Sequence, residues 1–155
     1  MNKSRTVFVD TSGFKALVDP KDEFHLRAVK VWADFAKSGT KLVSSNYILD
    51  ESYTVIRIKC GLEVAREFRE LLASNGEEIK IMRITLSDEH LAWGWFERNW
   101  SKLSFTDCTC FALMKRLGLG HFFGFDEHFE RAGFESVAGV ETSTLDLVKE
   151  GRRFG

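Results

Sequence analysis

Four acidic residues from distant parts of the chain are the best candidates for chemistry. They are Asp10, Glu51, Asp107 and Asp126. If these carboxylates meet, two of them about 4 Å apart repel by about 4 kcal/mol at an effective dielectric constant near 20. Such a cluster either shares protons or binds a cation, and oxygen ligands select hard ions such as Mg²⁺ or Mn²⁺ over zinc. An ion held in this way can activate water for attack on a phosphodiester.

Two of these acids directly follow predicted strands. The apolar runs 6–9 and 122–125 have the composition of strands buried on both faces of a sheet, and Asp10 and Asp126 come next. Because ligands of open parallel α/β sheets bind beyond the carboxyl ends of the strands, both carboxylates are expected at that edge. Taken singly, each is also explained as a turn or helix cap.

The other two acids lie near the beginnings of predicted helices. Glu51 is one turn into a helix at 47–59 that follows the second predicted strand, and only helical phase separates it from the equally acidic Asp50. Asp107 stands three residues after Ser104, which resembles a capping box with Asp in place of Glu or Gln. Both helices are expected to start near the same sheet edge, so all four acids converge there.

The remaining pattern alternates short apolar runs with longer helical stretches, which predicts an α/β protein with a parallel sheet. Further strands are expected at 41–44, 79–84 and 134–137. Asp22 and Ser87 are the expected N-caps of the helices that follow them.

The composition is that of an ordinary globular protein. Of the 155 residues, 44% are hydrophobic and 29% are charged, with a net charge of -1. This charge excludes a basic field over the whole molecule, so any nucleic-acid contact must come from a local patch. The three cysteines do not complete a zinc site. No secretory signal or membrane-spanning run is evident, which predicts a cytoplasmic protein.

Four short segments together resemble the PIN-domain family. They read Val7-Phe8-Val9-Asp10-Thr11-Ser12, Ile48-Leu49-Asp50-Glu51, Leu103-Ser104-Phe105-Thr106-Asp107-Cys108 and Gly124-Phe125-Asp126-Glu127-His128-Phe129. The resemblance extends from about Val7 to Val137 and is nearest to VapC-type toxins of bacterial toxin–antitoxin pairs. Residues 1–140 are assigned to this domain, and residues 141–155 to a C-terminal tail.

This resemblance implies a three-layer α/β/α sandwich with a central, mainly parallel sheet of four or five strands. It also implies an endoribonuclease that uses Mg²⁺ or Mn²⁺, hydrolyses RNA phosphodiester bonds, pairs with an antitoxin protein and forms a homodimer. Asp10 and Asp107 would be the main metal ligands. Glu51 and Asp126 would complete the site, by direct ligation or by orienting water.

Several side chains near the acids are candidates for supporting roles. The hydroxyls of Ser12 and Thr106 suit either helix capping or a hydrogen bond to a ligand carboxylate. Lys15 is the expected phosphate contact, because it should lie near the Asp10 edge. His128, two positions after Asp126, could be a base or a metal ligand, but a place at the surface or in packing contacts is preferred, since a metal-activated water needs no separate histidine base.

The segment around Asp126 departs from the family, whose members often have a hydroxyl residue before this acid. Here Gly124 and Phe125 precede it, and Glu127 adds a negative charge directly after it. With the mildly acidic net charge, this departure slightly favours an alternative function. That alternative is a catalytically weak PIN-like module that binds RNA or protein.

Trp93, Trp95 and Trp100 are predicted to lie in one helix. They cannot all share one helical face, so at least one is expected to be partly exposed. We expect core packing and a dimer or antitoxin contact in preference to stacking on RNA bases.

Two other classes of acidic-site α/β protein fit less well. Phosphatases of the haloacid dehalogenase kind have a second aspartate two residues after the first, where this chain has Ser12. Response-regulator receivers have an adjacent acidic pair before the phosphorylated aspartate, and no such pair flanks the first strand.

Overall fold

The computed structural model describes residues 5–138, which form five strands and seven helices. The strands are β1 (Thr6–Val9), β2 (Lys41–Ser45), β3 (Ile79–Met82), β4 (His121–Phe123) and β5 (Glu135–Ser136). The helices are α1 (Thr11–Val18), α2 (His25–Ser38), α3 (Asn46–Cys60), α4 (Leu62–Ser74), α5 (Leu86–Phe96), α6 (Phe105–Leu117) and α7 (Glu127–Arg131). Within residues 5–138, no helix is long and apolar enough to cross a membrane.

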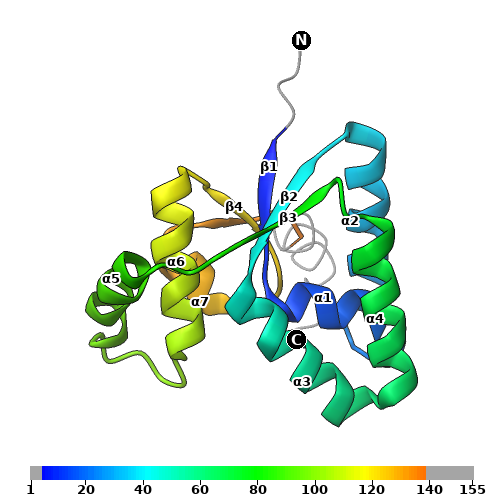
Figure 1. Cartoon of the computed structure of the whole chain (residues 1–155), viewed down its shortest axis with the longest axis horizontal. Coiled ribbons are helices and arrows are strands. Elements are labelled where there is room, and N and C mark those ends of the chain that lie inside the picture. Colours follow the sequence, from blue (N-terminus) through cyan, green and yellow to red (C-terminus); the bar gives the residue numbers. More distant parts are fainter. Residues whose placement is uncertain (1–4, 139–155) are drawn as a thin grey trace, which may run out of the picture.

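All five strands are parallel and lie in the order β3-β2-β1-β4-β5. The strand β1 is central, because Phe8 is paired with Val43 of β2 on one side and with Phe122 of β4 on the other. Helices cover both faces of the sheet, with α5 and α6 on one side and α1, α2 and α4 on the other (Figure 1). The predicted three-layer α/β/α sandwich with a parallel sheet is confirmed.

The carboxyl ends of β1 and β4 meet where the strand order reverses. From β1 the chain moves outward to β2 and β3, and it then returns to β4 on the other side of β1. At this junction the N–H of Asp10 donates a hydrogen bond to the carbonyl of Phe123 (3.0 Å). Such switch points are the usual ligand crevices of open α/β sheets.

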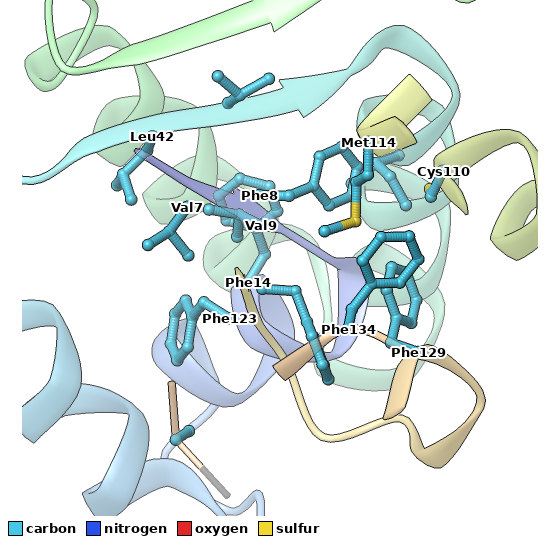
Figure 2. Close-up of a cluster of buried hydrophobic side chains, with 14 of the residues drawn as sticks. Val7, Phe8, Val9, Phe14, Leu42, Cys110, Met114, Phe123, Phe129 and Phe134 are labelled. Atoms are coloured by element: carbon cyan, nitrogen blue, oxygen red, sulfur yellow. The ribbon is translucent and has the colours of Figure 1, made fainter. Parts of the chain in front are cut away.

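Aromatic packing fixes the elements around this junction. Val7, Phe8 and Val9 of β1 are completely buried and lie within the cluster that Figure 2 shows. From α7, Phe129 reaches into the same cluster and stacks on Phe122, with ring centroids 4.9 Å apart. Burying one phenylalanine side chain contributes about 2 to 3 kcal/mol. The short helix α7 is therefore held firmly against the sheet.

Two predicted N-caps were wrong. Asp22 accepts the N–H of Phe24 in the loop before α2 (2.8 Å), and α2 has no side-chain cap. The N-cap of α5 is Thr85, two residues before the expected Ser87. The helix begins after Thr85 because Thr85 forms a complete capping box with Asp88, which satisfies two backbone N–H groups at once.

Two predicted element ends also differ from the structure. The strand β4 ends at Phe123, so Asp126 follows it after a short loop and caps α7. The helix α5 ends at Phe96, and Trp100 lies in the connection to α6. The tail at 141–155 lies outside the described residues.

Candidate active site

The first acid is fixed by its own helix. Asp10 is the N-cap of α1, is only 3% exposed, and accepts hydrogen bonds from Ser12 through the backbone N–H (3.3 Å) and the hydroxyl (2.7 Å). The Ser12 hydroxyl oxygen in turn accepts the N–H of Phe125 (2.8 Å). This chain of bonds ties the loop after β4 to the acid after β1. Ser12 therefore lies in the supporting position that the sequence predicted, although its role in function stays a prediction.

The glycine before Phe125 has a steric explanation in this arrangement. A Cβ atom at Gly124 would lie 2.9 Å from the Ser12 hydroxyl and 3.0 Å from the Asp10 Cβ. Both distances are too short for a side chain to be added without displacement. The departure from the family pattern at this position therefore allows the close approach of the β4–α7 loop to Asp10.

The second acid is held by a hydroxyl that was not among the predicted site residues. The Thr11 hydroxyl donates to Glu51 Oε1 (2.5 Å) and accepts a hydrogen bond from the Ser52 hydroxyl (3.2 Å). Thr11 is buried and Glu51 is half-buried, whereas Asp50 is exposed. The structure thereby separates Glu51 from its acidic neighbour, as the predicted helical phase required.

The other two acids lie in the first turns of α6 and α7. Asp107 is 6% exposed, and its backbone N–H bonds to the Ser104 hydroxyl (3.0 Å), which confirms Ser104 as the N-cap. Asp126 is the N-cap of α7 and accepts the N–H of His128 (2.9 Å). The His128 ring lies between the two acids, with Nδ1 3.5 Å from Asp107 Oδ2 and 3.2 Å from Asp126 Oδ1.

The pKa values of Asp10 and Asp107 are raised, and other acids of the set contribute to both shifts. Burial raises the pKa of Asp10 to about 7; the Ser12 hydrogen bond opposes this rise, and the charges of Asp126 and Glu51 add to it. Burial also raises the pKa of Asp107 to about 9, with further contributions from the charges of Asp10, Asp126 and Glu51. In the described part of the chain, no lysine or arginine forms an ion pair with any of the four. The basic side chain that faces them is His128, whose Nδ1 lies 3.5 Å from Asp107 and 3.2 Å from Asp126, and further compensation of their charge must come from protons or an added cation.

The available ligand atoms suit a divalent metal ion. Asp107, Asp126 and His128 each offer one atom within 4.8 Å of the others. The Nδ1 atom of His128 is buried and has no hydrogen-bond partner. A buried nitrogen without a hydrogen bond, facing a group of carboxylates, is the arrangement expected where nitrogen and carboxylates share a bound cation.

Two other predicted residues lie near the site without contacting its acids. Lys15 is half-buried and forms ion pairs with Asp19 and Asp22, each at 2.9 Å. Thr106 is half-buried, and its carbonyl accepts the Thr109 hydroxyl (2.6 Å). Their expected contacts with phosphate and with the acids stay predictions.

The position of His128 was the least predictable from the sequence. It does pack, as expected, against Trp100, with ring centroids 6.3 Å apart and an interplanar angle of 10°. Its Nδ1 nevertheless faces the acids rather than solvent. The available signal was its position two residues after Asp126, because that backbone N–H commonly binds the cap carboxylate.

The tryptophans divide between core and surface. Trp95 and Trp100 pack against the core, whereas Trp93 is 55% exposed on α5. This confirms that at least one of them is partly exposed. The predicted dimer or antitoxin contact through this segment stays a prediction.

Known proteins resemble this chain over most of its length. The sequence model of the PIN-domain family matches residues 7–135. The 23S rRNA-specific endonuclease VapC20 of Mycobacterium tuberculosis, strains CDC 1551 / Oshkosh and ATCC 25618 / H37Rv, is 32% identical over 132 residues, or 84% of this chain and 97% of that protein. The crystal structure of M. tuberculosis VapC20, described as a sarcin-ricin loop cleaving toxin, matches with a TM-score of 0.73 and 30% identity, covering 83% of this chain and 95% of that chain.

Proposed function

Because the chain belongs to the PIN-domain family, we propose that it is a metal-dependent endoribonuclease that hydrolyses RNA phosphodiester bonds. The observation that supports this most directly is the set of four carboxylates near the sheet switch point, with which no lysine or arginine of the described residues forms an ion pair. A structural role alone would not favour so much unpaired negative charge in a buried place.

Asp10 and Asp107 are the proposed principal ligands of Mg²⁺ or Mn²⁺, with Glu51 and Asp126 completing the site. When bound, such an ion neutralises the carboxylates, activates water and stabilises charge on the scissile phosphate. The chain positions the ligands in advance. Ser12 fixes one oxygen of Asp10, and Thr11 fixes one oxygen of Glu51. Hydrogen bonds of this kind orient ligand carboxylates, so that little rearrangement is needed when an ion binds.

The proposed substrate is a ribosomal RNA loop, since VapC20 is named for cleavage of 23S rRNA and of its sarcin-ricin loop. By the same similarity we propose that the chain is the toxin of a toxin–antitoxin pair, acts in the cytoplasm, binds an antitoxin protein and forms a homodimer. A small DNA-binding-type protein encoded directly upstream would support the pairing. Light scattering of the purified chain tests the homodimer.

The cleavage test compares matched acidic variants on ribosomal RNA. The wild type should cleave with Mg²⁺ or Mn²⁺ and stop when a chelator is added. Asp10→Ala and Glu51→Gln should abolish or severely reduce cleavage, while Asp50→Asn should leave it intact because Asp50 is exposed. Circular dichroism checks that each variant is folded. Cleavage that survives both chelation and Asp10→Ala would contradict the proposal.

The alternative of a catalytically weak binding module makes a different prediction. Its main support was the Gly124-Phe125 departure, and the close approach of Gly124 to Asp10 gives that departure a structural reason compatible with catalysis. No divalent-ion binding in calorimetry, together with RNA binding without cleavage, would favour the module over the enzyme.

A further inference from the structure

His128 has the surroundings of a metal-binding histidine. The residue is 9% exposed, and its Nε2 lies 2.9 Å from the carbonyl oxygen of Ser101. A carbonyl oxygen only accepts hydrogen bonds, so Nε2 holds the ring proton in the neutral imidazole. The lone pair is then on Nδ1. Histidines that bind metals usually donate their other ring N–H in this way, which fixes the tautomer and the ring orientation.

The lone pair is directed at the acids and lacks any other partner. Nδ1 lies 3.2 Å from Asp126 Oδ1 and 3.5 Å from Asp107 Oδ2, and neither contact has the geometry of a hydrogen bond. It is the one buried side-chain nitrogen or oxygen of the described residues that lacks a hydrogen-bond partner. A lone pair facing carboxylate oxygens is unfavourable unless a positive charge lies between them.

The ring is also held before any ligand arrives. It stacks on Trp100, and the adjacent Phe129 is completely buried in the core. The backbone N–H of His128 bonds to Asp126, so the histidine and the cap carboxylate are oriented by the same turn. These contacts leave the Nδ1 direction fixed, as a ligand position requires.

We propose that His128 binds the metal directly through Nδ1, together with Asp107 and Asp126, and that this nitrogen makes the site select a transition-metal divalent ion over Mg²⁺. The inference rests on the metal site of the proposed function and specifies its ligand set. Oxygen ligands suit Mg²⁺, whereas imidazole favours transition ions, which also tolerate mixed nitrogen and oxygen ligands. Mn²⁺ is the probe of choice because it accepts both donors and is paramagnetic.

The direct test is pulsed electron paramagnetic resonance of the full chain loaded with Mn²⁺ in the absence of RNA. The wild type should show hyperfine coupling to a bound imidazole nitrogen. His128→Asn should lose this coupling, and His121→Asn should keep it, because His121 contacts Glu135 at the sheet edge rather than the acids. Bound Mn²⁺ without nitrogen coupling in the wild type would overturn the proposal and leave the carboxylate site standing. No bound Mn²⁺ at all would instead contradict the metal site and the proposed function.

Calorimetry then separates ligation from a merely structural role. If His128 is a ligand, His128→Asn should weaken Mn²⁺ binding about 10-fold or more and change Mg²⁺ binding much less. His128→Gln gives a second variant should Asn disturb the α7 turn, and thermal unfolding reports whether each is folded. Equal losses of affinity for both ions in folded variants would overturn the proposal, since they indicate that the imidazole only positions Asp107 and Asp126.

Discussion

Asp88 and Asp107 occupy the same local position and have opposite environments. Each is the third residue of its helix and follows a hydroxyl N-cap, Thr85 in α5 and Ser104 in α6. Asp88 bonds back to the Thr85 N–H (2.9 Å) and receives two hydrogen bonds from Arg116, both at 2.8 Å. Hydrogen bonding to Arg116 lowers the pKa of Asp88, whereas burial and neighbouring carboxylates raise the pKa of Asp107 to about 9.

The difference shows how one capping motif can serve either structure or chemistry. Around Asp88, the fold itself supplies the compensating positive charge, so the ion pair is complete. Around Asp107, the charges that raise its pKa are those of other carboxylates, and no lysine or arginine of the described residues forms an ion pair with it, so compensation must come from protons or a cation. The sequence motif is thus shared, and the residue placed opposite the carboxylate decides what it does.

Neutralising the two aspartates in turn is the strongest test of the difference between them. Asp107→Asn should reduce RNA cleavage by about 100-fold or more, since several kcal/mol of charge stabilisation depend on the metal. The same change should leave the melting temperature of the metal-free protein unchanged or higher, because folding no longer has to protonate a buried carboxyl group. Asp88→Asn should do the reverse, retaining cleavage but lowering the melting temperature. Equal effects of the two variants on both measurements would refute the distinction.

The melting temperature of the metal-free protein should depend on pH through Asp10 and Asp107. Asp10 and Asp107 bind protons more tightly in the folded state, so their stabilising contribution is complete below about pH 4 and is lost as the pH rises through about 7 and 9. We expect the metal-free protein to melt about 5 °C or more lower at pH 9 than at pH 5. Thermal unfolding in chelator measures this, and Mn²⁺ should reverse it. Asp107→Asn should make the melting temperature depend less on pH. A stronger dependence in this variant would count against the raised pKa of Asp107.

Removing Arg116, which forms the ion pair with Asp88, should lower the free energy of unfolding. Arg116→Met leaves Asp88 buried with only its capping bonds, while the arginine side chain itself is 36% exposed. Complete loss of a fully buried pair costs about 3 to 5 kcal/mol, and we expect about 2 kcal/mol here because solvent screens the arginine. Denaturant unfolding checks this. Lys115→Met is the adjacent control, and a matching loss there would show that charge removal from α6 alone is responsible.

The sequence predicted the parts of the site that depend on local position. Asp10 follows an apolar strand and Asp107 follows a hydroxyl cap, so strand and cap patterns place both near the carboxyl edge. The preference for Glu51 over Asp50 rested on helical phase, which a regular helix such as α3 preserves.

The parts that could not be predicted depend on contacts between distant residues. The orientation of His128 is set by the Ser101 carbonyl and by Trp100, neither of which a local pattern links to it. Lys15 belongs to α1, which begins directly after Asp10, but its ion pairs with Asp19 and Asp22 depend on how the loop after α1 folds back. In each case, a three-dimensional contact determines which way the side chain points.

The smallest predicted effect concerns Gly124, whose lack of a side chain lets the β4–α7 loop lie close to Asp10. Gly124→Ala would place a Cβ 2.9 Å from the Ser12 hydroxyl, so the hydroxyl or the loop must move and Asp10 loses part of its orientation. We expect about a 10-fold fall in cleavage, typical for loss of an orienting contact, with little change in metal-free stability relative to Asp88→Asn. Gly120→Ala is the control, because nothing lies within 4 Å of an added Cβ there. If Gly124→Ala cleaves as well as Gly120→Ala, the Ser12 bridge does not orient Asp10, and the uncompensated charge alone defines the site.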